Sequence, residues 1–235
     1  MLKKYLVITG ASSGIGLATT KLFLKQNFTV INLSRRVCPL GEVIHIPVDL
    51  AQLGFEEDLQ PKLLPHLENA ERVILVHNAA RLEKDTVNQI QAKSFRNILE
   101  INVVAPTILN QIVLPTMGKG SAIIYIGSTL SEKAVAGTFS YVTSKHAVVG
   151  QMRATCQDLM GTGIHTACIC PGFTDTEMLR THLKNDQAIL EHIKSMNAQH
   201  RLIAPEEIAQ TIYFAATQPV LNGAIIHANL GQKET

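Results

Sequence analysis

The sequence contains 235 residues, of which 46% are hydrophobic and 17% charged, and its 21 Lys and Arg against 19 Asp and Glu leave a formal net charge of +2. A charge this small does not build the positive field on which nucleic-acid and anionic-membrane binding depend, so we expect neither partner. A chain of this length buries a core large enough to fold without disulfides or structural metal, in either one large domain or two small ones.

The cysteines and histidines point to no metal or disulfide framework. The four cysteines form no CxxC pair and the nine histidines are scattered, so we expect reduced thiols, no metal site and a cytoplasmic location. The apolar stretch after Lys3 and Lys4 is shorter than a signal-peptide core, and no apolar run approaches the roughly 20 residues of a membrane span.

Seven short β-branched runs alternate with segments whose apolar residues recur every three or four positions. The predicted strands are Lys4–Thr9, Thr29–Leu33, Val43–Val48, Arg72–Val76, Ala122–Ile126, His165–Ile169 and Ala224–His227. The predicted helices are Leu17–Lys25, Phe55–Leu67, Ile90–Leu114, Tyr141–Met160 and Glu206–Thr217. Continuous apolar runs are typical of strands buried on both faces of a parallel sheet. The alternation favours a single doubly wound α/β Rossmann domain over residues 1–235, with seven parallel strands and helices on both faces.

One long segment, Phe173–Ala204, has no strand pattern and is more polar than its neighbours. A segment of this length inside a domain is usually functional, either a lid or a compact Ω-like insertion. We therefore predict a substrate lid over about residues 173–204.

A glycine-rich turn separates the first strand from the first helix. It contains Gly10, Gly14 and Gly16. Glycines allow a tight turn and close approach of the backbone to a pyrophosphate, whose charge the helix N-terminus stabilises. The turn predicts a dinucleotide site formed by Gly10, Ser12, Ser13, Gly14, Ile15 and Gly16.

A phenol and an ammonium group are predicted on one helix face, because Tyr141 and Lys145 are four residues apart. A neighbouring cation favours the phenolate, so we expect Lys145 to lower the pKa of Tyr141. Ser128 ends the fifth predicted strand, where parallel sheets present side chains to their active crevice. These three residues predict a centre that holds a carbonyl oxygen and transfers a proton to it.

The TGxxxGxG spacing from Thr9 to Gly16, together with Ser128 and the YxxxK pair, resembles the short-chain dehydrogenase/reductase family from Lys4 to about Gly231. The resemblance implies hydride transfer between a nicotinamide cofactor and a small-molecule carbonyl compound, with Tyr141 as general acid, Ser128 orienting the oxygen and Lys145 also binding the nicotinamide ribose. It further implies a homodimer or homotetramer.

The resemblance implies roles for further residues. Asn102 matches an asparagine whose bound water links the lysine to solvent. Asp49 matches an aspartate that contacts the adenine of the cofactor, although Asp is also a common helix N-cap at such a position. Asn78 and Ala79 match an NAG element in which Ala80 replaces the glycine. The PGxxxT motif supplies Pro171, Gly172, Thr174 and Thr176 to the cofactor site, with Thr176 toward the nicotinamide carboxamide. Tyr141 and Lys145 of the YxxxK pair are cofactor residues as well.

The second predicted strand ends without an acid and is followed by Arg35 and Arg36. An acid there accepts hydrogen bonds from the ribose 2′-hydroxyl, whereas arginine attracts a 2′-phosphate. We therefore predict NADP(H) as the cofactor.

The substrate is left open between several carbonyl compounds. The run from Pro171 to Met178 resembles the sepiapterin/benzil reductase-like branch, in which Asp175 would anchor a pterin and Phe173 would line the site. A 3-oxoacyl-[acyl-carrier-protein] reductase and a general ketone or aldehyde reductase fit equally. A non-catalytic NADP(H)-binding sensor is the alternative outside enzymology, although such a protein has no need of Ser128, Tyr141 and Lys145.

Overall fold

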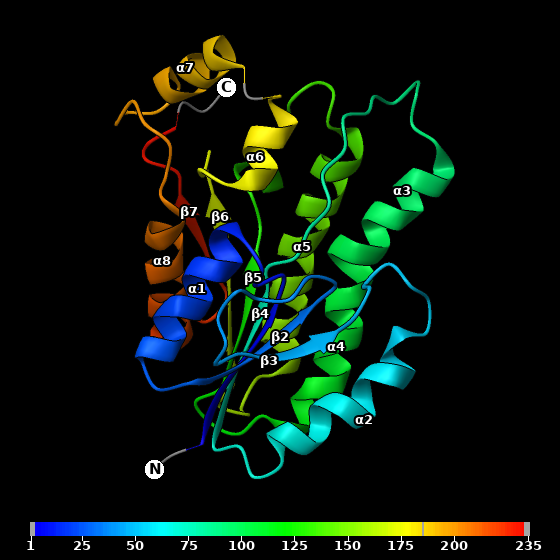
Figure 1. Ribbon diagram of the computed structural model, residues 1–235, viewed down its shortest axis with the longest axis vertical. Helices are drawn as coiled ribbons and strands as arrows, with labels where there is room; N and C mark the ends of the chain where they lie inside the picture. The colour runs from blue at the N-terminus through cyan, green and yellow to red at the C-terminus, as the bar shows by residue number, and fades with distance from the viewer. Residues whose placement is uncertain (1–2, 185, 233–235) are drawn as a thin grey trace.

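A computed structural model describes residues 3–184 and 186–232. A parallel sheet of seven strands runs through its centre in the order β3-β2-β1-β4-β5-β6-β7 (Figure 1). The strands are β1 (Lys4–Thr9), β2 (Thr29–Ser34), β3 (Ile44–Pro47), β4 (Arg72–His77), β5 (Ala122–Ile126), β6 (His165–Pro171) and β7 (Ala224–Ala228). The predicted doubly wound α/β architecture is confirmed. β6 extends past its predicted end because Cys170 and Pro171 still pair with β7.

The strand order reverses between β1 and β4. From β1 the chain runs outward to β2 and β3, and then returns to place β4 on the other side of β1. At such a reversal the connections at the carboxyl ends of the two strands diverge and leave a crevice, the usual ligand site of open α/β sheets. Gly10 follows β1 and Asn78 follows β4, so both lie at this point.

Helices cover both faces of the sheet because its central strands, β1, β4 and β5, are apolar and buried on both sides. α1 (Gly14–Lys25) and α8 (Pro205–Thr217) cover one face, and α2 (Phe55–Leu67), α4 (Ala105–Val113) and α5 (Phe139–Asp158) the other (Figure 1). Successive strand residues point to opposite faces. Thus Leu6 and Ile8 pack in the cluster that contains Phe23 of α1, whereas Val7 packs in the cluster that contains Leu63 of α2.

The long helix predicted for Ile90–Leu114 is interrupted. α3 (Ala92–Leu99) passes into a π-helical turn at Glu100–Val104 and then into α4, followed by a short 3₁₀ turn at Leu114–Thr116. Pro106, in the first turn of α4, has no N–H to donate to the carbonyl of Asn102, four residues earlier, and its ring would clash with that carbonyl in a regular α-helix. The wider turn avoids the clash, and it also sets the orientation of Asn102.

By length and composition, the helical run Ala92–Thr116 is the one stretch in the described parts of the chain that could cross a membrane. Ile98, Leu109 and Val113 of this run are fully buried, and the run forms part of the helical layer over the sheet (Figure 1). Core helices have the same apolar composition, so packing against the sheet accounts for it.

The lid segment contains two helices that the sequence pattern does not predict. α6 (Glu177–His182) and α7 (Gln187–Ser195) lie beyond the carboxyl ends of the strands (Figure 1). Each begins at a side-chain cap, since Thr176 accepts a hydrogen bond from Leu179 N, and Asp186 accepts from Ala188 N and Ile189 N. The segment is therefore a pair of short capped helices, and not an Ω-like loop.

A buried polar network links the sheet to the helices on one face. The His77 imidazole donates through Nε2 to Asn110 Oδ1 of α4 at 2.8 Å, and Asn110 Nδ2 donates to the Tyr125 hydroxyl at 2.6 Å. The Tyr125 hydroxyl lies 3.0 Å from Thr155 Oγ1 of α5. Burial lowers the pKa of His77 to about 4, with the hydrogen bond to Asn110 opposing the shift.

This network predicts acid sensitivity of the fold. Below pH 6.5 the unfolded chain protonates His77, whereas the folded chain does so only near pH 4. The free energy of unfolding is therefore highest above pH 6.5 and falls by up to about 3 kcal/mol by pH 4 through this group. Urea unfolding at pH 7 and pH 4.5 should show a smaller loss for His77→Gln than for the wild type. An equal loss in both proteins would contradict this role of His77.

Candidate active site

A cavity of about 1110 Å³ lies at the carboxyl ends of the strands. It is lined by the segments that follow β1, β2, β4, β5 and β6 and by the lid helices. Most of the predicted site residues line it: Gly10, Ser12, Ser13, Gly14, Ile15, Arg35, Arg36, Asp49, Asn78, Ala79, Ser128, Tyr141, Lys145, Pro171, Gly172, Phe173, Thr174 and Thr176. Gly16, Asn102 and Asp175 do not line it.

The glycine turn has a backbone conformation that favours glycine. Gly10 and Gly14 have φ of 73° and 53°, in the region where L side chains are strained. Gly16 instead permits close packing behind the turn, since a Cβ there would lie 2.1 Å from the Gly10 carbonyl oxygen. Gly16 therefore brings α1 against β1 and does not line the cavity, so its place in the dinucleotide site stays a prediction.

Asn78 holds the ends of β1 and β4 together. Its Nδ2 donates to the carbonyls of Thr9 and Gly10 at 3.0 and 3.1 Å, while Thr9 Oγ1 accepts from the N–H groups of Asn78 and Ala79. Ala80 is not among the non-glycine residues with positive φ, so the alanine that replaces the family's glycine fits without backbone strain.

The two arginines after β2 differ in their contacts. Both are exposed and line the cavity. Arg36 donates to Ser13 Oγ at 3.2 Å and forms an ion pair with Glu177 of α6 at 3.3 Å. Asp49 Oδ1 accepts from Ala51 N at 3.0 Å, in the manner of a cap, and also lines the cavity.

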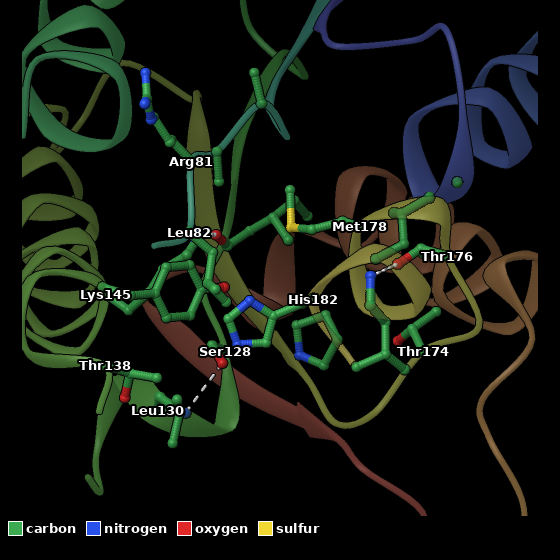
Figure 2. Close-up of a pocket in the computed structure, with 18 of the residues that line it drawn as sticks. Arg81, Leu82, Ser128, Leu130, Thr138, Lys145, Thr174, Thr176, Met178 and His182 are labelled. Carbon is green, nitrogen blue, oxygen red and sulfur yellow. Dashed lines mark hydrogen bonds between the residues drawn. The ribbon is translucent and has the colours of Figure 1, made fainter. Parts of the chain in front are cut away.

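Ser128, Tyr141 and Lys145 all line the cavity, and Figure 2 shows Ser128 and Lys145 there. Ser128 Oγ accepts from Leu130 N at 3.1 Å and hydrogen-bonds with the Tyr141 hydroxyl. Tyr141 is the third residue of α5, and Lys145 follows one turn later with its ammonium 5.5 Å from the phenol ring centre. The two hydroxyls thus point to one location from different elements.

The predicted effect of Lys145 on Tyr141 is wrong for this structure. Burial raises the pKa of Tyr141 to about 12, and the hydrogen bond from Ser128 opposes it only in part. Burial likewise lowers the pKa of Lys145 to about 8. Lys145 Nζ donates to the Ile126 carbonyl at 2.6 Å, so its charge is directed to the strand end and desolvation dominates at the phenol.

Asn102 is a positioning residue in this structure. Its Oδ1 accepts from Arg81 N at 2.8 Å, and its Nδ2 donates to Arg81 O and to Ser144 Oγ, each at 2.9 Å. Ser144 Oγ in turn donates to the Tyr141 carbonyl at 2.8 Å. The amide therefore joins the loop after β4 to the first turn of α5, while the water-mediated link from Lys145 to solvent that the resemblance implies for Asn102 stays a prediction.

The prediction that Asp175 faces a substrate is corrected by the contacts of its carboxylate. Arg180 holds both carboxylate oxygens of Asp175, at 2.6 and 2.8 Å, and thereby lowers its pKa. The neighbours Thr174 and Thr176 do line the cavity (Figure 2). Asp175 therefore pairs within the lid segment, and does not face a substrate in this structure.

Asp85 was not predicted, yet it anchors the start of the helix that carries Tyr141. Its N–H donates to Gly137 O at 3.0 Å, its carbonyl accepts from Phe139 N, and its Oδ1 accepts from Ser140 N at 3.0 Å. Ser131 was missed as well, and its Oγ accepts from Ser128 N at 3.0 Å. The Asp85 contacts join segments far apart in the sequence and follow no spacing rule. Ser131 lies three residues after Ser128 and forms a capping box with it, so this spacing is the signal that could have identified it.

Replacing Asp85 by Ala should destabilise the protein. The change leaves Ser140 N–H without its acceptor at the first turn of α5, which costs about 1–2 kcal/mol of the free energy of unfolding. Urea unfolding measures this loss directly. Asp158→Ala, at the exposed far end of the same helix, is the matched control and should change the free energy by less than about 0.5 kcal/mol. Equal effects of the two variants would contradict the anchoring role.

Comparisons with known proteins identify the family to which this chain belongs. The family model for the short chain dehydrogenases matches residues 4–187. The chain is 26% identical to the 3-oxoacyl-[acyl-carrier-protein] reductase FabG of Chlamydia pneumoniae, over 92% of this chain and 90% of that protein. It is 24% identical to carbonyl reductase family member 4 of Xenopus tropicalis, over 95% of each chain.

A solved structure of 4-hydroxyisoleucine dehydrogenase complexed with NADH superposes with a TM-score of 0.87 at 25% identity, covering 97% of this chain and 98% of that one. The family model spans the glycine turn, Ser128, Tyr141 and Lys145, which are the residues that the cavity brings together. This chain belongs to the short-chain dehydrogenase family of oxidoreductases.

Proposed function

We propose that the protein is an NADPH-dependent carbonyl reductase, which transfers hydride to a ketone or aldehyde. One observation carries the proposal. The hydroxyls of Ser128 and Tyr141 are hydrogen-bonded to each other at a cavity wall, and the same cavity contains the glycine turn. The relatives named as 3-oxoacyl reductase and carbonyl reductase support a carbonyl substrate.

The residues present fit a nicotinamide dinucleotide. A Cβ at Gly10 would lie 3.3 Å from Asn78 Nδ2, so the turn leaves no room for a side chain on the side of β4. Arg35 and Arg36 supply positive charge beside the end of β2, which supports NADPH over NADH. When bound, the reduced nicotinamide supplies a hydride to the carbonyl carbon.

The chain's own residues act on the carbonyl oxygen. Ser128 Oγ–H donates a hydrogen bond that orients the oxygen and stabilises the charge that develops on it. Tyr141 then gives its hydroxyl proton to the same oxygen, so that hydride and proton together convert the carbonyl to an alcohol. The raised pKa of Tyr141 keeps the phenol protonated at neutral pH, as an acid for the reductive direction requires. Lys145 holds a positive charge close to the phenolate that remains.

The lid over about residues 173–204 is proposed to close the substrate end of the cavity. Its helices contribute Met178, His182, Ile189 and Met196 to the lining. Asp175 is occupied by Arg180, which removes the support for a pterin anchor at that position. Excluding water at this end strengthens the hydrogen bonds at Ser128 and Tyr141.

Steady-state assays test the proposal. Loss of NADPH absorbance is followed with ketones, diketones, aldehydes, pterins and oxoacyl thioesters, while NADPH binding is measured separately by its fluorescence. We expect turnover with at least one apolar ketone or aldehyde. Tight binding of NADPH without turnover of any class would favour a sensor and contradict the proposal.

A further inference from the structure

The lid end of the cavity has an apolar wall that is not covered. Met178 of α6 and Ile189 of α7 line the cavity and are 46% and 41% exposed, and Val135 on the loop before α5 is 56% exposed. Leu82 and Leu130 line the cavity as well, and Figure 2 shows Met178 reaching toward Leu82. Apolar side chains exposed inside a concave site indicate an apolar ligand.

Basic side chains outnumber acidic ones among the described residues that line the cavity. Within residues 3–184 and 186–232, the only acids that line the cavity are Asp49 and Asp85. Asp49 follows β3, on the Arg35 side of the sheet, and Asp85 accepts the Ser140 N–H. Glu83, which neighbours Lys84, pairs with Arg81.

Lys84 and His182 both line this end. They come from different segments, the loop after β4 and the lid helix α6. Burial lowers the pKa of His182, and the Lys84 ammonium lowers it further. Both residues line the same cavity. No ion pair in the described chain uses Lys84. His182 and Ser128 line the same cavity, and Figure 2 shows the His182 ring facing into it.

We propose that the substrate is an apolar carbonyl compound that carries a carboxylate, with its hydrocarbon body against Met178 and Ile189 and its carboxylate between Lys84 and His182. The inference rests on the proposed function, because it takes this end of the cavity as the substrate site. An ammonium and an imidazole N–H can both donate to a carboxylate. A polyol or a free amine would instead face the apolar wall and the positive charge.

Binding of unreactive substrate mimics separates this inference from catalysis. The probes are nonanoate, its uncharged amide nonanamide, and the shorter heptanoate, each titrated calorimetrically into the protein–NADP⁺ complex. We expect nonanoate to bind about fivefold more tightly than nonanamide because of the partly exposed ion pair. We expect it to bind about tenfold more tightly than heptanoate because two further methylenes are buried.

Three variants assign the contacts. Lys84→Met should abolish the preference for nonanoate over nonanamide and keep the preference for the longer chain. Lys93→Met, an exposed lysine of α3 that does not line the cavity, should keep both preferences. Met178→Gln should reduce the chain-length preference alone.

The opposing outcomes are equally definite. The inference would be overturned if the wild type bound nonanoate and nonanamide equally, or if it bound nonanoate and heptanoate equally. It would also be overturned if Lys84→Met and Lys93→Met had equal effects. Turnover is then measured with 4-oxodecanoic acid and its methyl ester. The expected binding pattern without NADPH oxidation by any carbonyl compound would leave the carboxylate-binding site standing and refute the proposed function, and with it the assignment of the ligand as a substrate. Turnover without the expected binding pattern would do the reverse.

Discussion

Tyr141→Phe is expected to lower kcat for carbonyl reduction by roughly a hundredfold to ten-thousandfold, the usual contribution of a positioned general acid. The variant keeps the aromatic ring, which is nearly buried and packs at the start of α5. It removes only the hydroxyl that is hydrogen-bonded with Ser128. The affinity for NADPH should therefore change little, and stopped-flow or steady-state rates with a turned-over ketone measure the loss.

Tyr125→Phe is the control for this variant. Tyr125 is also buried and hydrogen-bonded, to Asn110 and Thr155, but does not line the cavity. It should cost stability and leave kcat of the folded protein close to that of the wild type. Near-normal kcat in Tyr141→Phe would remove the proposed acid from the mechanism.

Replacing Arg35 and Arg36 together by Ala should raise the Kd for NADPH by about a hundredfold and leave the Kd for NADH almost unchanged, because charge-assisted contacts to a phosphate contribute about 1.5–3 kcal/mol each. Arg36 already pairs with Glu177 and Ser13 in the free protein. The contribution of Arg36 to NADPH binding is therefore partly offset by the loss of these contacts. Of the two single variants, Arg35→Ala should raise the Kd for NADPH more than Arg36→Ala.

Fluorescence titration with both cofactors measures this selectivity. Arg96→Ala, an exposed arginine of α3 outside the cavity, controls for the general loss of positive charge. Equal weakening of NADPH and NADH in the double variant would show that the pair does not read the 2′-phosphate.

Local sequence patterns predicted the sheet well because a buried strand is a continuous run of apolar residues. β1 and β5 match their predicted ranges, since each is a continuous apolar run between polar ends. α6 and α7 were missed because their apolar residues are few and their starts depend on the caps Thr176 and Asp186. The π-helical turn was missed because its cause is the single ring of Pro106 inside an otherwise helical pattern.

The candidate site was predictable where a motif fixes the local backbone, as at Gly10, Gly14 and the pair Tyr141 and Lys145. The site was not predictable where a side chain has several possible hydrogen-bond or ion-pair partners. Asp175 lies in the expected motif, but Arg180, five residues later, holds its carboxylate. Asn102 and Asp85 act through loops distant in the sequence.

The pKa of Tyr141 shows the same limit. The spacing places a cation nearby but does not reveal how deeply the phenol is buried, and burial decides the direction of the shift.

Transfer of deuterium from labelled NADPH tests the central claim most directly. NADPH with both hydrogens at nicotinamide C4 replaced by deuterium is incubated with the enzyme and a ketone, and the alcohol is analysed by mass spectrometry and NMR. The proposed function predicts one deuterium, bonded to the carbinol carbon, and an unlabelled hydroxyl whose proton comes from Tyr141 and then solvent. An alcohol without deuterium at that carbon, or no alcohol while NADPH binds, would contradict hydride transfer by this protein.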